Sequence, residues 1–412
     1  MPFITFVAAL TAMFPMGGAT VVAIRMGRGD KKGANNAFMT AFSLTLIMSV
    51  MLMIVGMAFY KQIVDLSGAG GLSEEMRNMS AQYLFYYSAF SVPMLMGTCL
   101  CVFVRNDGSP TLSIIGMCAG AAANIFLDWL FIYPFQMGIM GAAVASGLGQ
   151  VLTVIILLTH FLRKKGDLRI RAVKFDGALA AKVCKRCVPE AVTQLTTPVT
   201  ALCYNLMLAR LVGDIGVSTF SVLSFIYSLA NAVLSGVAQG LQPLWGQCYG
   251  RKDTAELKWF FRSGIIINGV LSVLIYAVLF LLDVPVIRIF NREEELISAA
   301  SAALPLFALS FIPMSVNLVY TAYFFSTKRT GAADIVAISR GIVLKAAMIF
   351  ILPTIFGTNA IWTAPLRRVI RASISPAKCK RRRASSFVRL CAILKSSVQR
   401  GQYRPLFCLS IF

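Results

Sequence analysis

The residues most able to do chemistry in this sequence are polar side chains that interrupt long apolar stretches. Asp128 lies in the apolar run 111–133, and Asn124 precedes it by four residues, so a helix would place both side chains on one face. A carboxylate inside a membrane span is costly and by default functional, because it can exchange a proton or bind a cation. We expect Asp128, hydrogen-bonded by Asn124, to form a site for a coupling ion (H⁺ or Na⁺) or a substrate. The alternative is a carboxylate at the membrane interface.

A second apolar stretch, 188–209, carries Glu190 near its start and Asn205 deeper inside. Glu190 could bind a cation, or it could simply be a favourable negative charge at the N-terminus of a helix. Asn205 could hydrogen-bond to a neighbouring helix and hold the two helices together. We include both residues among the candidates for the coupling-ion and substrate site.

A third stretch, 332–355, contains Arg340 and Lys345. Either residue could pair with a carboxylate across a cavity; alternatively, its long side chain could carry the charge to the membrane surface. His160, the single histidine, borders a basic loop and is not expected to relay protons. No cluster of residues predicts a catalytic centre or a metal site, and no Walker loop predicts ATP binding. We therefore expect neither an enzyme nor a bound cofactor.

Composition identifies the elements that must position these residues. The chain is 58% hydrophobic and only 14% charged, whereas soluble proteins carry about 25% charged residues. A membrane span needs ~20 apolar residues, and runs without period-two alternation predict helices rather than barrel strands. Ten such runs occur: 2–24, 39–60, 81–104, 111–133, 138–162, 188–209, 217–247, 264–282, 299–326 and 332–355. We expect an all-α polytopic membrane protein. Its spans should bend at the prolines that interrupt them, as hinges or as static kinks; these are Pro15, Pro93, Pro243, Pro313 and Pro353.

The charge of the loops between these runs predicts the orientation of the chain. Basic loops alternate with neutral or acidic loops, and by the positive-inside rule the basic loops face the cytoplasm. The basic loops are 25–38, 163–186, 248–262 and 327–331, of which 163–186 is strongly basic, and the net acidic loops are 61–79 and 283–297. This pattern predicts a multi-pass membrane protein whose basic loops are cytoplasmic. The first run then crosses from outside to inside, which predicts that a preceding helix is missing.

One pattern occurs in two copies that are 223 residues apart. The first copy begins at Gly17-Gly18 and ends in Gly27-Arg28-Gly29-Asp30, and the second begins at Gly240 and ends in Gly250-Arg251-Lys252-Asp253. Each copy closes an apolar run with small residues and a basic turn. Two such halves in a very apolar chain predict a transporter built from repeated bundles.

The repeat also predicts where each half should begin and end. Met1 would fall inside the second helix of the first half, so we expect the first helix to be missing. After Leu366 the expected last helix gives way to a tail with twelve Lys and Arg and no Asp or Glu. Each such charge costs ~2.5–3.5 kcal/mol at the centre of a span. We interpret the tail as the product of a frameshift, and the alternative is a native polybasic segment attracted to anionic lipid or nucleic acid.

We accordingly expect about ten or eleven helices in two repeated bundles, with the first and last helices missing or disrupted. The predicted parts are an N-terminal bundle, a basic cytoplasmic linker, a C-terminal bundle, and a frameshift-derived or disordered tail. Their bounds are 1–165, 166–187, 188–366 and 367–412.

These motifs resemble those of the MATE (multidrug and toxic compound extrusion) family. Segment 17–34 is similar to that family's second helix and the following loop. Segment 239–250, with its Gln-Pro-Leu and Tyr-Gly, is similar to the equivalent helix of the second half in the bacterial multidrug-pump branch. Segment 124–128, Asn-Ile-Phe-Leu-Asp, resembles the fifth-helix motif, and 357–365 looks like the start of the twelfth helix. The resemblance covers about residues 1–366.

The resemblance implies a twelve-helix fold in a bacterial cell membrane, with two six-helix bundles that face each other across a central cavity. It also implies antiport of organic cations or amphiphilic drugs against H⁺ or Na⁺. Asp128 would then alternate between an ion-bound and a substrate-competent state. One alternative is a lipid-linked oligosaccharide or polysaccharide flippase of the same superfamily, which Arg340 and Lys345 would suit. The others are a lipid-modifying membrane enzyme and an inactive, truncated gene product. We expect a monomer in a lipid bilayer, with a drug-like small molecule as substrate and no nucleic acid.

Overall fold

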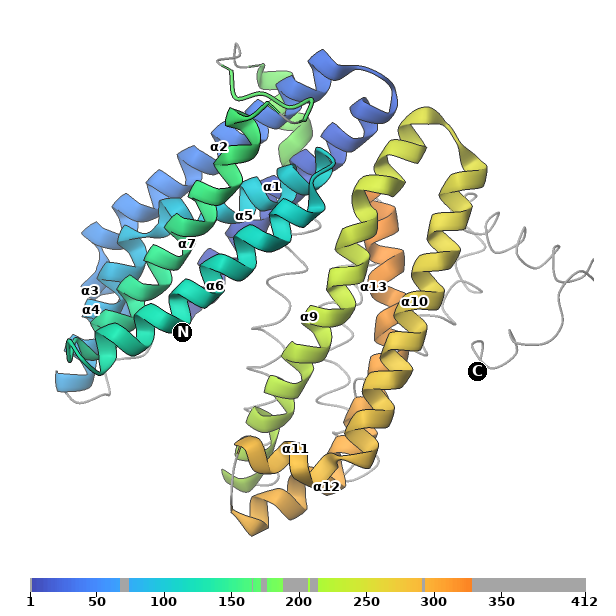
Figure 1. The fold of residues 1–412 in the computed structure, drawn as a ribbon. Coiled ribbons are helices and arrows are strands. Elements are labelled where there is room, and N and C mark those ends of the chain that lie inside the picture. The colour runs from blue at the N-terminus through green and yellow to red at the C-terminus, as the bar shows by residue number, and fades with distance from the viewer. Residues whose placement is uncertain are drawn as a thin grey trace, which may run out of the picture. The chain divides into compact units, whose positions relative to one another are not determined.

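The structure is a computed structural model in which residues 2–66, 74–164, 166–171, 176–187, 207, 214–290 and 293–327 are described. These residues form helices joined by short turns, and no strand occurs among them (Figure 1). The helices are α1 (Pro2–Gly27), α2 (Lys31–Ala58), α3 (Tyr60–Leu66), α4 (Glu74–Ala89), α5 (Ser91–Asn106), α6 (Pro110–Ile132), α7 (Gly138–Leu162), α9 (Asp214–Arg251), α10 (Thr254–Leu281), α11 (Asp283–Phe290), α12 (Glu294–Ala308) and α13 (Phe311–Ser326). A further helical segment spans 177–187. The all-α prediction is confirmed.

Long apolar helices lie where the apolar runs predict them. α7 has the same bounds as the run 138–162. α6 begins at Pro110, where a proline is tolerated because the first N–H of a helix is unpaired in any case. Five described helices are long and apolar enough to cross a membrane, and the bent pairs α4–α5 and α12–α13 raise this number to seven. The protein is therefore a multi-pass membrane protein. The run 332–355 and the tail after 366 lie outside the described residues, as does the run 188–209 except for residue 207.

Two spans are broken at matching places in the two halves of the sequence. α4 and α5 meet at 49°, and α12 and α13 meet at 44°. Pro93 and Pro313 lie in the first turns of α5 and α13. In a straight helix each proline ring would strike the carbonyl four residues earlier, which is where each break falls. The bends expected at these two prolines are present. The interruptions expected at Pro15 and Pro243 are not, because both residues lie inside the continuous helices α1 and α9, and Pro353 lies outside the described residues.

Two short helices lie in segments that the sequence analysis treated as loops. α3 has 7 residues and α11 has 8. Their first residues, Tyr60 and Asp283, are separated by the same 223 positions as the repeated motif. Helices of this length are too short to produce the apolar signal of a span, which explains why the sequence did not predict them.

Contacts between residues divide the chain into two compact units. Among the described residues, unit 1 contains α1 to α7 and the segment 177–187. It also contains the end of α9 and the start of α10 (Gln239–Ser263), together with the end of α13 from Thr321. Unit 2 contains the rest of α9, α10 and α13, together with α11 and α12. The contiguous bundles predicted from the repeat are a different, sequence-based division and stay a prediction.

Each unit has its own hydrophobic core. In unit 1 the ring of Phe38 stacks on Phe161 at 5.3 Å between centroids and meets Phe103 edge-on at 4.9 Å. In unit 2 the rings of Phe307 and Phe311 meet edge-on at 6.0 Å within a cluster of buried aliphatic side chains. These aromatic contacts bring α2, α5 and α7 together in unit 1, and α12 and α13 together in unit 2.

Candidate functional site

The repeated Gly-Arg-x-Asp motif has one structure in both copies. In the first, Gly29 has φ 76°, and Asp30 accepts a hydrogen bond at 2.8 Å from a backbone amide in the first turn of α2. In the second, Lys252 has φ 62°, and Asp253 accepts one at 3.0 Å from an amide in the first turn of α10. The left-handed residue ends one helix and the aspartate caps the next. The motif therefore builds a helix–turn–helix corner in each half.

The two copies of the motif also contact each other, inside unit 1. A Cβ atom on Gly250 would lie 3.0 Å from the Cα atom of Gly27, and a Cβ on Gly27 would overlap the carbonyl oxygen of Gln247. One turn away, Gly246 faces Ala23 in the same way. Small residues four apart on both helices let their backbones approach closely, as in other membrane helix pairs. The repeat therefore marks the point where α1 and α9 cross.

The remaining small residues of the first copy pack against other helices. A Cβ on Gly17 would overlap the sulfur of Cys187 in the helical segment 177–187. A Cβ on Gly18 would overlap Ala41 of α2. α1 thus packs against different helices on its different faces, and its small residues determine how closely each neighbouring helix can approach.

Asp128 carries a buried oxygen atom without a hydrogen-bond partner among the described residues. Its side chain is partly buried on α6, and its Oδ1 atom is inaccessible to solvent and has no hydrogen-bond partner within the described residues. The phenol of Tyr83, on α4, interacts electrostatically with this carboxylate. On the same helix Phe126 and Trp129 are 58% and 54% exposed, so α6 turns aromatic side chains outward and Asp128 toward α4. A buried acceptor without a donor is a place where a proton or a cation can bind.

Asn124 makes a different hydrogen bond from the expected one to Asp128. Its Nδ2 atom donates a hydrogen bond to Ser146 Oγ of α7 at 3.2 Å, and Asp128 Oδ1 is left without a partner in the part of the chain described. The amide therefore joins α6 to α7 and does not satisfy this carboxylate oxygen. The four-residue spacing predicted only that Asn124 and Asp128 lie on one face of the helix. It could not predict that the Asn124 amide donates its hydrogen bond to Ser146.

The other predicted site residues cannot be placed. Glu190, Asn205, Arg340 and Lys345 all lie outside the described residues. Within the described ranges no group of three His, Cys, Asp or Glu side chains could hold a metal ion.

Sequence reasoning missed a buried hydrogen bond between Asp107 and His160. His160 Nε2 lies 2.8 Å from Asp107 Oδ2, and the two side chains are 0% and 1% exposed. Asp107 Oδ1 also accepts hydrogen bonds from the backbone amides of Asp167 at 2.9 Å and Leu168 at 3.2 Å. The carboxylate fixes the start of the basic linker to the ends of α5 and α7. The only sequence signal was that both residues lie at ends of apolar runs on the side of the basic loops.

Replacing Asp107 by asparagine should lower the stability of unit 1. The amide has one acceptor oxygen where the carboxylate has two, so its Nδ2 group cannot accept the hydrogen bonds that the replaced oxygen accepts. We expect a cost of about 1–3 kcal/mol, the usual cost of an unsatisfied buried group. The measurement is the thermal unfolding of the purified protein in detergent. Asp167→Asn is the matched control, because its ion pair with Lys31 is exposed and such pairs contribute about 0–1 kcal/mol. Equal unfolding temperatures for the two variants would contradict this role.

Comparison with known proteins places these features in context. The family model described as MatE matches residues 1–130 and 189–351. The multidrug export protein MepA of Staphylococcus saprophyticus is 23% identical over 377 residues, which cover 90% of this chain and 82% of the relative. MepA of Staphylococcus aureus strain MRSA252 is 22% identical over 368 residues, which cover 88% of this chain and 80% of the relative.

Solved structures share the fold. A crystal structure of MATE in complex with MaL6 superposes with a TM-score of 0.86 at 20% identity, and covers 91% of this chain and 84% of that chain. A MOP superfamily transporter from Pyrococcus furiosus, described as having a binding pocket of reverse polarity that suggests a different function, has a TM-score of 0.85 at 21% identity, with the same coverage of 91% and 84%. At such low identity the likeness establishes the fold alone, which is the twelve-helix fold of these transporters.

Proposed function

Because this chain belongs to the MatE family and is therefore a transport protein rather than an enzyme, we propose that it is a secondary antiporter. It exports organic cations and amphiphilic drugs from a bacterial cell in exchange for H⁺ or Na⁺, and it acts as a monomer without a bound cofactor. The substrate class comes from the MepA relatives, whose names describe multidrug export.

The observation that supports coupling is the state of the Asp128 carboxylate. Its buried Oδ1 has no hydrogen-bond donor among the described residues, so protonation or cation binding would satisfy it at no cost in broken bonds. A bound proton or Na⁺ neutralises the charge, and release of the ion restores a carboxylate that attracts a cationic substrate. The coupling ion and the cationic substrate thus compete for the negative charge of Asp128, and this competition makes the protein exchange one for the other. Glu190, Asn205, Arg340 and Lys345 are further proposed members of this coupling-ion and substrate site.

We infer that the contact between α1 and α9 at their crossing must separate during transport. Both helices end at basic loops, 25–38 and 248–262, which the positive-inside rule assigns to the cytoplasm. Gly27 and Gly250 therefore hold the two halves of the sequence together near the cytoplasmic surface. We infer that these glycines separate when the site opens to the cytoplasm, and that the bends before Pro93 and Pro313 absorb the accompanying change in helix direction.

Ethidium accumulation in cells tests the proposal. A drug-sensitive bacterial strain that carries this chain in its membrane should accumulate several-fold less ethidium than the same strain with an empty vector. A protonophore should abolish the difference if H⁺ is the coupling ion, and removal of external Na⁺ should do so if Na⁺ is. Accumulation equal to that of the empty vector, with the protein shown to be folded in the membrane, would reject export of this substrate class and favour an inactive product.

A further inference from the structure

Two cations and an indole ring lie together on the surface near the start of α10. Lys258, Trp259 and Arg262 are all exposed, and the exposed fraction of Trp259 is 63%. Because successive residues of an α-helix are rotated by about 100°, Arg262 falls between Lys258 and Trp259 on one face. All three residues belong to unit 1.

The two cations have no acidic partner in the described part of the chain. None of the ion pairs found there includes Lys258 or Arg262. The nearby carboxylates have other partners: Glu256 pairs with Arg251 at 2.8 Å, and Asp253 accepts a hydrogen bond from a backbone amide of α10 at 3.0 Å. Both positive charges are therefore available to an anion from outside the chain.

The repeat shows that these charges are not needed to build the corner before α10. α2 and α10 have 28 residues each and begin 223 positions apart. The counterparts of the three surface residues are Asn35, Asn36 and Met39. In the first half Asn35 accepts the backbone amide of Arg169 at 2.6 Å, and Met39 is buried. The start of α2 thus packs against the protein with neutral side chains, whereas the start of α10 presents two cations and an indole to its surroundings.

The same face of α10 continues as an apolar surface. Ile266, Val270 and Val273 are 64%, 56% and 50% exposed, and the helical rotation places them in line with Arg262 and Trp259. α10 is long and apolar enough to span a membrane. Tryptophan is enriched where such a span meets the membrane surface, at the level of the lipid headgroups. The basic loop 248–262 assigns this end to the cytoplasm, where the leaflet carries anionic lipids.

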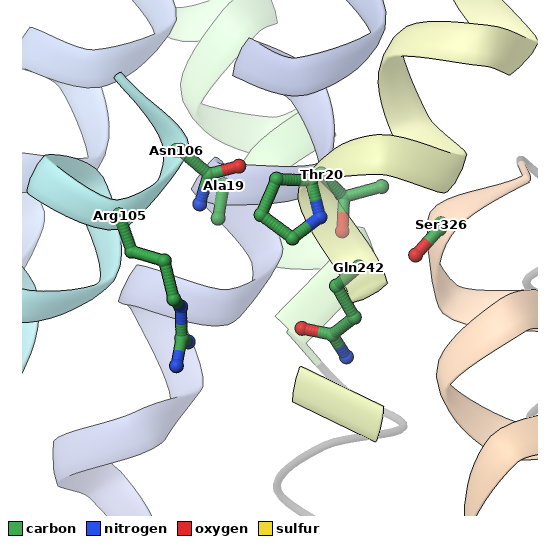
Figure 2. A pocket seen from close by; sticks show the side chains of 7 residues that line it. Ala19, Thr20, Arg105, Asn106, Gln242 and Ser326 are labelled. Atoms are coloured by element: carbon green, nitrogen blue, oxygen red, sulfur yellow. The ribbon is translucent and has the colours of Figure 1, made fainter. Parts of the chain in front are cut away.

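The polar pocket beside the crossing of α1 and α9 is not an alternative site for such a headgroup. Figure 2 shows Arg105 of α5 and Gln242 of α9 among the side chains that line it. The pocket has room for about one water molecule. The exposed cations of α10 have no such limit on the size of their ligand.

We propose that Lys258, Trp259 and Arg262 form a binding site for an anionic phospholipid of the cytoplasmic leaflet. A guanidinium can donate two parallel hydrogen bonds to a phosphate group, and the ammonium adds a second positive charge. The indole lies at the level of the headgroup, and the acyl chains cover the apolar face that follows. A zwitterionic lipid carries its own cation, which offsets the attraction. The bound lipid anchors the start of α10 at the membrane surface.

Quenching of tryptophan fluorescence by brominated lipid tests this site in the purified full chain, without any measurement of export. The protein is placed in phosphatidylcholine nanodiscs that contain a minor fraction of lipid with brominated acyl chains. Brominated phosphatidylglycerol should quench more strongly than brominated phosphatidylcholine at the same fraction, because it gathers beside Trp259. The chain has four tryptophans, so Trp259→Phe assigns the signal and should lose the excess quenching. If the parent shows no excess, or Trp259→Phe keeps it, the site is wrong.

A double variant, Lys258→Gln with Arg262→Gln, keeps the fluorescent probe and removes both cations. It should need roughly 10-fold more phosphatidylglycerol for the same excess quenching, since each surface cation contributes a several-fold preference for anionic lipid. Arg163→Gln with Lys164→Gln is the matched control, because it removes two charges from exposed positions at the end of α7. The control should behave as the parent does, and both double variants should unfold at the parental temperature. Equal losses in the two double variants would overturn the site, because net charge alone would then explain the binding.

Inorganic phosphate separates a lipid headgroup from a free anion. Added in excess to the same nanodiscs, phosphate should leave most of the excess quenching in place, because the acyl chains keep the headgroup at the membrane surface. If phosphate removes the excess quenching while chloride at equal ionic strength does not, the cations bind free phosphate and the assignment to a lipid is wrong.

Discussion

Gly250→Leu is expected to abolish both stable folding of unit 1 and export. Even a Cβ atom at this position would overlap the carbonyl oxygen of Ile24 and lie 3.0 Å from the Cα atom of Gly27. Backbone atoms cannot move aside as a flexible side chain can, so α1 and α9 would have to part. Overpacking a tight contact costs about 1–3 kcal/mol and sometimes more, and leucine adds three carbons beyond Cβ. The measurements are the yield of monodisperse protein in detergent, its unfolding temperature, and ethidium efflux.

Gly240→Leu is the matched control for this crossing. Gly240 lies on the same helix, is exposed, and has no described neighbour within 4 Å of a built Cβ atom. Leucine also has a better helix propensity than glycine, by roughly 0.5–1 kcal/mol. We expect folding yield and unfolding temperature close to those of the parent. Similar losses in both variants would show that bulk on α9, and not the crossing, is responsible.

Asp128→Asn is expected to leave the fold intact and to reduce ion-driven export at least ~10-fold. The substitution keeps the size of the side chain, and Oδ1 has no hydrogen bond to lose within the described residues. An amide neither takes up a proton near neutral pH nor balances a cation, so the ion and the substrate lose the charge for which they compete. Efflux and unfolding temperature are measured on the same preparations.

Asp167→Asn is the matched control for Asp128. It makes the same carboxylate-to-amide change at a side chain that is 49% exposed and paired with Lys31. Export by this variant should equal that of the parent. Equal export by Asp128→Asn and Asp167→Asn would contradict the proposed role of Asp128 in ion-driven export.

Much of the fold could be predicted because its signals are local. The apolar runs predicted the long helices. Pro93 and Pro313 predicted the two bends, because a proline ring clashes with the backbone of its own helix. The repeated motif predicted two related halves. α3 and α11 were not predicted, because each is too short to give a span's apolar signal.

The sites were less predictable, because their contacts join distant parts of the chain. The sequence showed that the motif occurs twice, but only the structure shows that Gly27 and Gly250 contact each other. Asp107 and His160 are 53 residues apart and pair inside the protein, where no spacing rule applies. Asp128 stays a predicted site residue, chosen because a carboxylate within an apolar run is energetically costly and therefore rare.

Gradient-driven uptake of ethidium into proteoliposomes tests the central claim, that Asp128 couples ion and drug movement. Parent protein should concentrate ethidium inside the vesicles when an outward gradient of H⁺ or of Na⁺ is imposed, and should not do so without one. Asp128→Asn, reconstituted in equal amount, should fail to concentrate ethidium under either gradient. Ion-driven accumulation by Asp128→Asn at the parental rate would contradict the claim.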